Sequence, residues 1–230
     1  MAGKHRTAVT HVLMVVDKSG SMFHLAGDVR GGFNAYIDGL RKDDKHEYRL
    51  TVALFDTTYR LLCVDAELDK VPELDHNNYA TGGNTALYDA VCRTVIDFEN
   101  AHTKTGLAKN DRVLVVIQTD GLENSSVEYT ASTTRMMLDA RQELQRWSVI
   151  YLGAGMDTWL QARGMGIRHG SYVNTRATGQ GTHNTYDALR GSTILLASTG
   201  RDAVAETVRA AMASDVCMIP DCGCSGKAHA

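Results

Sequence analysis

Apolar runs alternate with amphipathic segments along most of the chain. The runs at 11–16, 113–117 and 147–152 are mostly apolar and rich in valine, isoleucine and leucine, a pattern typical of strands buried on both faces. Residues 26–41 and 86–102 instead place apolar side chains three or four positions apart, which predicts amphipathic helices. Buried strands separated by helices indicate an α/β protein.

Further elements follow from the same two periodicities. Residues 48–55 and 59–64 are β-prone segments on either side of a short polar turn, which predicts a β-hairpin. The other expected elements are helices at 131–145, 157–163, 186–197 and 201–213 and a strand at 171–173, with Met137, Ala140 and Leu144 on the buried face of the first of these helices. The polar, glycine-bearing stretch 174–185 is interpreted as a loop. We therefore predict a doubly wound α/β fold with a mostly parallel central sheet, an antiparallel edge hairpin and helices on both faces.

Composition favours one folded domain with short extensions. The chain has 230 residues, 43% of them hydrophobic and 22% charged, which is enough apolar material for one core and argues against disorder. We expect the domain at 10–213, between an N-terminal extension at 1–9 and a cysteine-containing tail at 214–230. The net charge of −3 gives no electrostatic reason to expect a nucleic acid partner. No run approaches the ~20 apolar residues of a membrane span, so no membrane partner is expected.

Cysteine usage and the first residues bear on location. The five cysteines are an odd number, and Asp17 interrupts the apolar stretch that follows the basic start, too early for a signal peptide. We therefore expect reduced thiols in a cytoplasmic protein. Cys63 and Cys92 are interpreted as small buried side chains.

Oxygen-bearing side chains follow the two central apolar runs. Asp17, Ser19 and Ser21 come directly after the first run, and Asp120 comes after the second. The carboxyl ends of parallel strands share one edge of a sheet, where α/β proteins bind their ligands. Thr85 lies in a glycine-rich loop that leads into a helix, and a connection of the usual handedness brings it to the same edge. Carboxylate and hydroxyl oxygens that converge there suit Mg²⁺.

These three segments resemble those of the von Willebrand factor A family. The matching stretches are DKSGSM at 17–22, TGGNTALYDA at 81–90 and QTDG at 118–121, and they follow one another in the family's order. The resemblance covers residues 10–213, and three motifs in order are specific where one alone is weak. It implies a Rossmann-like sheet that carries a metal-ion-dependent adhesion site.

The resemblance also implies a role for each ligand. Ser19 and Ser21 would bind the ion directly through their hydroxyl groups. Asp17 and Asp120 would act mainly through water molecules. Thr85 would bind directly or through water. The expected ion is Mg²⁺, with Mn²⁺ or Ca²⁺ as alternatives, and it would take an Asp or Glu side chain of a protein partner as its remaining ligand.

Three further residues are candidates for supporting the ion or forming its rim, namely Lys18, Gly83 and Glu123. Lys18 adds a positive charge beside the predicted site. Glu123 would either support the metal or compete with the carboxylate of a partner. Gly83 belongs to the same glycine-rich loop as Thr85.

A binding protein is expected rather than an enzyme. Family members without export signals often serve in intracellular assemblies, so the expected partner is an ATPase or another member of a multiprotein complex. Two alternatives stay open. The chain is either a structural or assembly component with a vestigial metal site, or a metal-assisted hydrolase in which Glu123 is the only visible candidate base.

The cysteine-rich tail is a second and weaker candidate metal site. Cys217, Cys222 and Cys224, with His229 nearby, offer sulfur and nitrogen ligands for zinc. Their spacing is not one of the common C-x2-C forms. A loose tail with reduced thiols is therefore the preferred interpretation.

Overall fold

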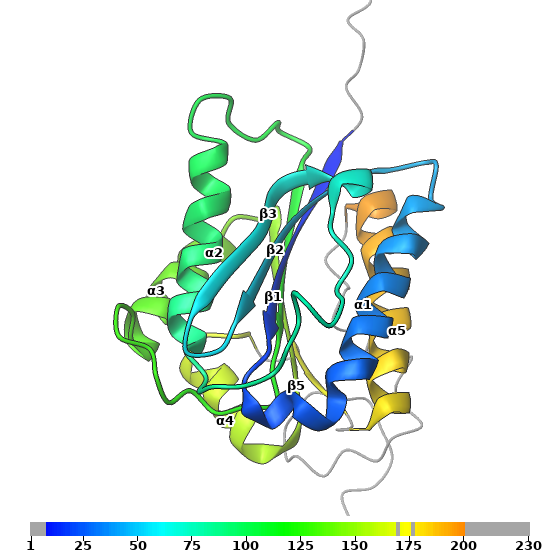
Figure 1. The fold of residues 1–230 in the computed structure, drawn as a ribbon. Coiled ribbons are helices and arrows are strands. Elements are labelled where there is room, and N and C mark those ends of the chain that lie inside the picture. Colours follow the sequence, from blue (N-terminus) through cyan, green and yellow to red (C-terminus); the bar gives the residue numbers. More distant parts are fainter. Residues whose placement is uncertain (1–7, 169–170, 176–177, 201–230) are drawn as a thin grey trace, which may run out of the picture.

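The computed structural model describes residues 8–168, 171–175 and 178–200. Its centre is a six-stranded sheet with the strand order β3-β2-β1-β4-β5-β6 (Figure 1). The strands are β1 (Val9–Asp17), β2 (Glu47–Phe55), β3 (Tyr59–Glu67), β4 (Arg112–Gln118), β5 (Trp147–Gly153) and β6 (Tyr172–Asn174). The α-helices are α1 (Ala26–Arg41), α2 (Leu87–Ala101), α3 (Ala131–Gln142), α4 (Gly155–Gly164) and α5 (Gly179–Thr199), and the 3-10 helices are η1 (Gly20–Leu25) and η2 (Leu68–Lys70).

Neighbouring strands of the sheet run parallel with one exception. β1 pairs with β2 on one side and with β4 on the other, and the parallel series continues through β5 to β6. β3 pairs antiparallel with β2 and forms the edge of the sheet. The predicted doubly wound fold with an antiparallel edge hairpin is confirmed.

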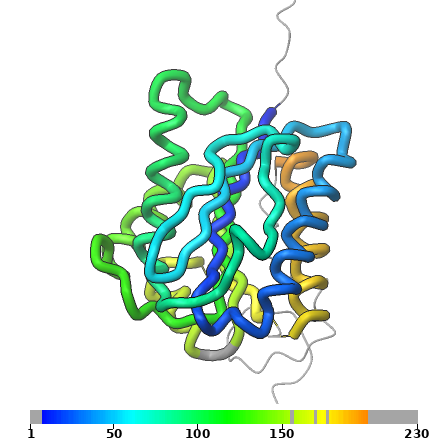
Figure 2. Tube along the Cα trace, viewed as in Figure 1, coloured from blue at the N-terminus to red at the C-terminus, as the bar shows by residue number. Residues whose placement is uncertain are grey.

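Helices cover both faces of the sheet. α1 and α5 pack together on one face, and α2, α3 and α4 lie on the other (Figures 1 and 2). Every residue of β1 is buried. Because side chains alternate along a strand, Val12, Met14 and Val16 join the core beneath α1 and α5, while Leu13 and Val15 join the core on the opposite face. The central strand is thus fixed from both sides.

The helix α1 has the bounds that the sequence predicts. Its apolar positions Val29, Phe33 and Ile37 are all buried. Gly32 and Gly39, which lower the helix propensity, face α5, and a Cβ atom on either would clash with a side chain of that helix. Tight packing of α1 against α5 therefore accounts for these two glycines.

The buried face of α3 differs from the prediction. Leu138 and Gln142 are buried, whereas Ala140 and Leu144 are exposed, so the predicted inward positions of these last two are wrong. The side-chain amide of Gln142 donates hydrogen bonds to two backbone carbonyl groups. A polar residue with satisfied hydrogen bonds can occupy the interior, and the apolar pattern alone does not reveal this.

The helix α5 begins earlier than expected. It starts at Gly179, so most of the stretch 174–185 is helical and its interpretation as a loop is wrong. The side chain of Thr178 accepts a hydrogen bond from the backbone N–H three residues later, which caps the helix. Thr182 and Thr185 are buried, and their hydroxyl groups donate to carbonyl groups four residues earlier. Because this stretch is polar, its sequence does not show that it contains the buried first turns of a helix.

Several expectations fall on residues outside the described ranges. These are the helix at 201–213, the tail at 214–230 and most of the N-terminal extension at 1–9. Among the residues that are described, no helix combines the length and the apolar character needed to cross a bilayer.

Candidate metal centre

The strand order reverses at the centre of the sheet, between β1 and β4. The chain passes from β1 to β2 on one side, and β4 pairs with β1 on the other side. Loops that diverge at such a point leave room for a ligand between them. Val16 and Gln118 form the last pair of the β1–β4 ladder, so Asp17 and Thr119 are the next residues on either side of this opening.

The buried carboxylate of Asp17 is held through both of its oxygens. The backbone N–H of Ser19 donates to Oδ1 at 2.6 Å, and the hydroxyl of Thr119 donates to Oδ2 at 2.5 Å. The pKa of Asp17 is raised to about 6, chiefly by burial and slightly by the charge of Asp120, although the hydrogen bonds from Thr119 and Ser19 act to lower it. A cation would stabilise the ionised form of such a carboxylate.

The 3-10 helix η1 turns the chain back over the end of β1. The hydroxyl oxygens of Ser19 and Ser21 lie 3.2 Å apart, with the first side chain buried and the second exposed. The hydroxyl of Ser21 donates to Oδ1 of Asp120 at 2.8 Å. This bond joins the loop after β1 to the loop after β4.

Side-chain oxygens from three segments meet beside Gly121. A Cβ atom added to this glycine would lie 2.8 Å from Oγ1 of Thr85, 3.1 Å from Oγ of Ser21 and 3.2 Å from Oδ2 of Asp17. Glycine therefore leaves a small space that all three oxygens face. Hydroxyl and carboxylate oxygens are the ligands that Mg²⁺ prefers, so the residues present fit the ion. Their binding of it stays a prediction.

Lys18 is paired with a carboxylate from the turn between β2 and β3. Its ammonium group forms an ion pair with Asp56, and each side chain is 14% exposed. The positive charge expected beside the site is therefore balanced locally.

Gly83, in the loop before α2, adopts a φ of +71°, and its carbonyl accepts a hydrogen bond of 3.1 Å from the N–H of Gly20. Glycine suits this left-handed conformation, and the bond ties two of the ligand loops together.

The carboxylate of Glu123 organises the loop after β4 against the start of α2. Its Oε1 accepts hydrogen bonds from the N–H groups of Ser125 at 2.9 Å and Ser126 at 2.7 Å. Its Oε2 accepts from the N–H of Tyr88 at 3.0 Å and from the hydroxyl of Ser126 at 2.7 Å. Both oxygens are thus engaged in positioning the loop. A carboxylate is also favoured at this place because it lies at the N-terminus of a helix.

Sequence reasoning did not single out two residues that position the ligands. Thr119 holds Asp17, as described above, and its place directly before Asp120 was the available signal. The side-chain oxygen of Asn124 accepts from the N–H of Thr85 at 2.8 Å, and the N–H of Asn124 donates to the carbonyl of Thr85 at 3.0 Å. This reciprocal pair fixes the Thr85 loop, and no spacing rule points to it.

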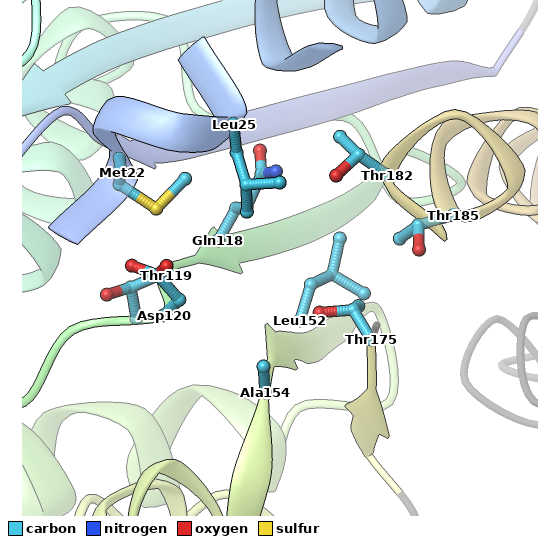
Figure 3. A pocket seen from close by; sticks show the side chains of 10 residues that line it. All are labelled: Met22, Leu25, Gln118, Thr119, Asp120, Leu152, Ala154, Thr175, Thr182 and Thr185. Carbon is cyan, nitrogen blue, oxygen red and sulfur yellow. The ribbon is translucent and has the colours of Figure 1, made fainter. Parts of the chain in front are cut away.

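A pocket adjoins Asp120 on the side of α5 (Figure 3). Met22 and Leu25 of η1 line one wall, and Thr182 and Thr185 from the first turns of α5 line another. Asp120 is the charged residue among the lining side chains. The early start of α5 therefore extends the surface beside the predicted ion.

The weaker zinc candidate lies outside the residues that the structure describes. Cys217, Cys222 and Cys224 all fall after residue 200. Cys63 and Cys92, by contrast, are free thiols on β3 and α2. Burial raises the pKa of each to about 11, so both thiols stay protonated at neutral pH.

Solved structures share the fold, although no protein-family model and no curated protein sequence matches the chain. Proximal thread matrix protein 1 from the mussel byssus has a TM-score of 0.55 at 14% identity, over 82% of this chain and 46% of its own. The PilB minor pilin from Streptococcus sanguinis has a TM-score of 0.61 at 12% identity, over 86% and 64%. Manganese-loaded TRAP protein from Plasmodium vivax has a TM-score of 0.51 at 18% identity, over 73% and 68%.

The matched structures decide the type of fold. A further structure of the mussel protein has a zinc-occupied MIDAS motif, the metal-ion-dependent adhesion site, and matches with a TM-score of 0.52 at 13% identity over 84% of this chain. This chain has the von Willebrand factor A fold. It spans less than half the length of the mussel protein, of which 46% is covered. The likeness shows the fold, and the edge of this chain's sheet carries the three predicted ligand segments.

Proposed function

We propose that this chain is a protein-binding domain that depends on a divalent cation. Mg²⁺, with Mn²⁺ or Ca²⁺ as alternatives, would be held by Asp17, Ser19, Ser21, Thr85 and Asp120. An Asp or Glu side chain of a protein partner would complete its coordination. The convergence of hydroxyl and carboxylate oxygens beside Gly121 carries this proposal.

The donor set favours an acidic ligand from outside the chain. Ser19, Ser21 and Thr85 offer neutral hydroxyl groups, and both carboxylates already accept hydrogen bonds from hydroxyl groups. When bound, the cation supplies positive charge that neutral ligands leave uncancelled. A carboxylate of a partner would then add favourable charge pairing at an exposed position next to Ser21.

Exposed apolar side chains beside the site support a protein as the partner. Phe23, two residues after Ser21, is 78% exposed, and Leu122, next to Gly121, is 47% exposed. Large apolar side chains exposed together with polar groups are typical of interaction surfaces. A partner that presents an acidic residue flanked by apolar groups fits this rim.

The proposed setting is an intracellular assembly in the cytoplasm, with an ATPase or another complex member as partner. A scaffold with a vestigial metal site is the main alternative, because a correct ligand set does not by itself ensure affinity for Mg²⁺, which loses its water ligands reluctantly. A metal-assisted hydrolase is less favoured. Both carboxylate oxygens of Glu123, its candidate base, already accept hydrogen bonds within the loop.

Binding of Mg²⁺ tests the proposal directly. Calorimetric titration and thermal unfolding with and without Mg²⁺ would compare the wild-type chain with Ser21→Ala. The matched control is Ser132→Ala, which removes another exposed serine hydroxyl, on α3. We expect one Mg²⁺ to bind and raise the melting temperature in the wild type and the control, and Ser21→Ala to weaken both effects, because a ligand of the native state stabilises by mass action.

Partner binding is the second stage of the same test. A partner found in Mg²⁺ should be released by EDTA, should fail to bind Ser21→Ala and should lose affinity when its own contacting Asp or Glu becomes Asn or Gln. If the wild-type chain bound no divalent cation, the scaffold alternative would replace the proposal. Partner binding that is unaffected by EDTA would have the same consequence.

A further inference from the structure

A second group of metal-ligand side chains lies at the opposite end of the sheet. His11 is near the start of β1, Asp65 is near the end of the antiparallel strand β3, and His102 directly follows α2. This is the end of the sheet at which β1 begins, away from η1 (Figure 1). One ligand atom from each of the three residues lies within 4.8 Å of the others. The distance along β1 from His11 to Asp17 is about 20 Å at the usual strand rise, so this group is separate from the first site.

The carboxylate of Asp65 lies between the two imidazole rings. Its Oδ1 is 2.7 Å from Nδ1 of His11, and its Oδ2 is 3.2 Å from Nε2 of His102. The side chains are 2%, 16% and 14% exposed for His11, Asp65 and His102, respectively. Four-coordinate zinc with bonds of about 2.0–2.1 Å separates neighbouring ligand atoms by about 3.3 Å. Small side-chain adjustments would therefore bring the three groups into coordination geometry.

The other ring nitrogen of His102 sets the protonation of its imidazole. Nδ1 of His102 lies 2.9 Å from the carbonyl oxygen of Phe98. A carbonyl only accepts, so Nδ1 carries a proton and donates it, and in the neutral ring Nε2 has the lone pair, on the side of Asp65. Histidines that bind metal ions in proteins are usually oriented by a hydrogen bond of this kind.

The second ring nitrogen of His11 lies near a carboxylate without a hydrogen bond to it. Nε2 of His11 is buried and has no hydrogen-bond partner among the residues that the structure describes, and Oδ2 of Asp111 lies 3.7 Å away. A neutral ring that donates from Nδ1 to Asp65 would turn the lone pair of Nε2 toward this second carboxylate, which is unfavourable. A metal ion on Nδ1 would place the proton on Nε2 instead, directed toward Asp111, as in carboxylate–histidine–zinc arrangements.

The backbone at Asp65 has a left-handed conformation. Asp65 has a φ of +44°, a region that aspartate and asparagine enter more readily than other residues with side chains, and its N–H donates to Oγ1 of Thr51 at 3.0 Å. Arg49 also lies 3.4 Å from Oδ2 of Asp65, but its guanidinium is shared with Glu47 at 3.9 Å and Glu67 at 3.5 Å. The arginine therefore has other carboxylates to pair with when Asp65 binds an ion.

We propose that His11, Asp65 and His102 bind a divalent transition metal ion of the zinc type, with a water molecule as fourth ligand. Two imidazole nitrogens and one carboxylate oxygen are a donor set typical of zinc and unlike the oxygen-only set beside Gly121. The bound ion would tie β1, β3 and the end of α2 to one another.

The test isolates this group from the other candidate ligands of the chain. The full-length background variant carries Asp120→Ala together with Cys217→Ser, Cys222→Ser and Cys224→Ser, so that neither the first site nor the tail competes. Zn²⁺ is titrated by calorimetry after treatment with EDTA, and Co²⁺ is used as a spectroscopic probe. We expect one equivalent of Zn²⁺ and the visible absorption of four-coordinate Co²⁺ without a thiolate charge-transfer band.

Three variants in this background identify the ligands. His102→Gln removes one imidazole at the end of α2 and should weaken Zn²⁺ binding by more than about 100-fold, since loss of an outer hydrogen-bond partner alone costs 10- to 100-fold. Asp65→Asn should do the same and suits the backbone, because asparagine tolerates positive φ. His76→Gln changes an exposed histidine elsewhere and should bind Zn²⁺ like the background.

The outcomes separate a metal site from a hydrogen-bonded cluster. Loss of Zn²⁺ binding in His102→Gln and Asp65→Asn, but not in His76→Gln, would support the site. If the background bound no Zn²⁺, or if both ligand variants retained full affinity, the three residues would form only a buried ion-pair network and the proposal would be wrong. A cooperative unfolding transition of each variant in EDTA would show that the compared chains are folded. Because Asp120 is already replaced, failure of the Mg²⁺ site does not affect the result.

Discussion

The hydroxyl of Thr119 donates a hydrogen bond of 2.5 Å to Oδ2 of Asp17 across the point where the strand order reverses. The two residues follow the last pair of the β1–β4 ladder, so sheet register alone makes them neighbours. The carboxylate is thereby oriented by the fold itself. One of the three oxygens beside Gly121 owes its position to this contact.

A methyl group beside these oxygens should block the ion. Gly121→Ala places its Cβ 2.8 Å from Oγ1 of Thr85, in the space that the cation would need. The wild-type chain should gain about 2.7 kcal/mol of stability when Mg²⁺ is present at 100 times its Kd, and the variant should gain none. Chemical denaturation with and without Mg²⁺ measures this difference.

Gly164→Ala is the control for the added methyl group. A Cβ atom at Gly164, at the end of α4, has no neighbour within 4 Å in the described part of the chain. This variant should keep the full Mg²⁺ effect. If Gly121→Ala also kept it, the ion would bind elsewhere or Thr85 would not be a ligand.

The raised pKa of Asp17 predicts a pH-dependent stability in the metal-free chain. The group has a pKa of about 6 in the folded state because of burial, against an ordinary value of 3.8. Between these values the native state binds the proton more tightly than the unfolded state, so the contribution of this group to stability rises as the pH falls through about 6 and is complete below the unfolded value. The full effect is up to about 3 kcal/mol, from about 1.4 kcal/mol per pKa unit.

Mg²⁺ and Asp17→Asn should each remove this pH effect. The cation favours the ionised carboxylate and lowers its pKa, and asparagine does not titrate. Unfolding free energies measured in EDTA and in Mg²⁺ between about pH 7 and about pH 5 would show the difference. Equal pH slopes for wild type and Asp17→Asn in EDTA would contradict the assignment of the titration to Asp17.

Glu123→Gln should destabilise the fold without weakening Mg²⁺ binding to the folded chain. The substitution removes the charge that accepts hydrogen bonds at the start of α2 and in the following loop. We expect a loss of about 1–2 kcal/mol, as for a helix cap. Calorimetry below the unfolding temperature gives the Mg²⁺ affinity separately, and a fall comparable with that of Ser21→Ala would instead make Glu123 part of the ion site.

Two leucines near the end of α3 should respond differently to truncation. Leu138 is fully buried, whereas Leu144 is 48% exposed. Leu138→Ala should cost about 2–5 kcal/mol through lost contacts and a cavity, while Leu144→Ala should change stability by less than about 0.5 kcal/mol. Urea denaturation of the two variants would show which face of α3 meets the core. A larger loss of stability in Leu144→Ala than in Leu138→Ala would instead support the buried face expected from the apolar pattern.

The sequence predicts those parts of the fold in which burial and apolar character coincide. The apolar positions Val29, Phe33 and Ile37 mark the buried face of α1 because that face packs on the sheet. The same reasoning fails at Gln142 and at Thr182, where polar side chains enter the interior with their hydrogen bonds satisfied. Tertiary contacts decide such positions, and local pattern does not reveal them.

The two candidate sites likewise differ in how far the sequence predicts them. Asp17 and Asp120 lie in short motifs after strands, so a parallel sheet predicts that they meet, and the usual handedness of the connection adds Thr85. His11 and Asp65 are 54 residues apart in the chain, and no motif joins them to each other or to His102. Only the antiparallel return of β3 and the length of α2 bring the three side chains together.

Burial of β1 along its whole length would influence the rate and selectivity of the proposed cation binding. The backbone at the end of β1 is held by strands on both sides, and both carboxylate oxygens of Asp17 accept hydrogen bonds, so this carboxylate is oriented before an ion arrives. Folding already orders this carboxylate, so binding of an ion would lose little further conformational entropy at Asp17. Exchange of water molecules from the incoming cation would then limit the on-rate, and a preorganised cavity would discriminate ions by their radius.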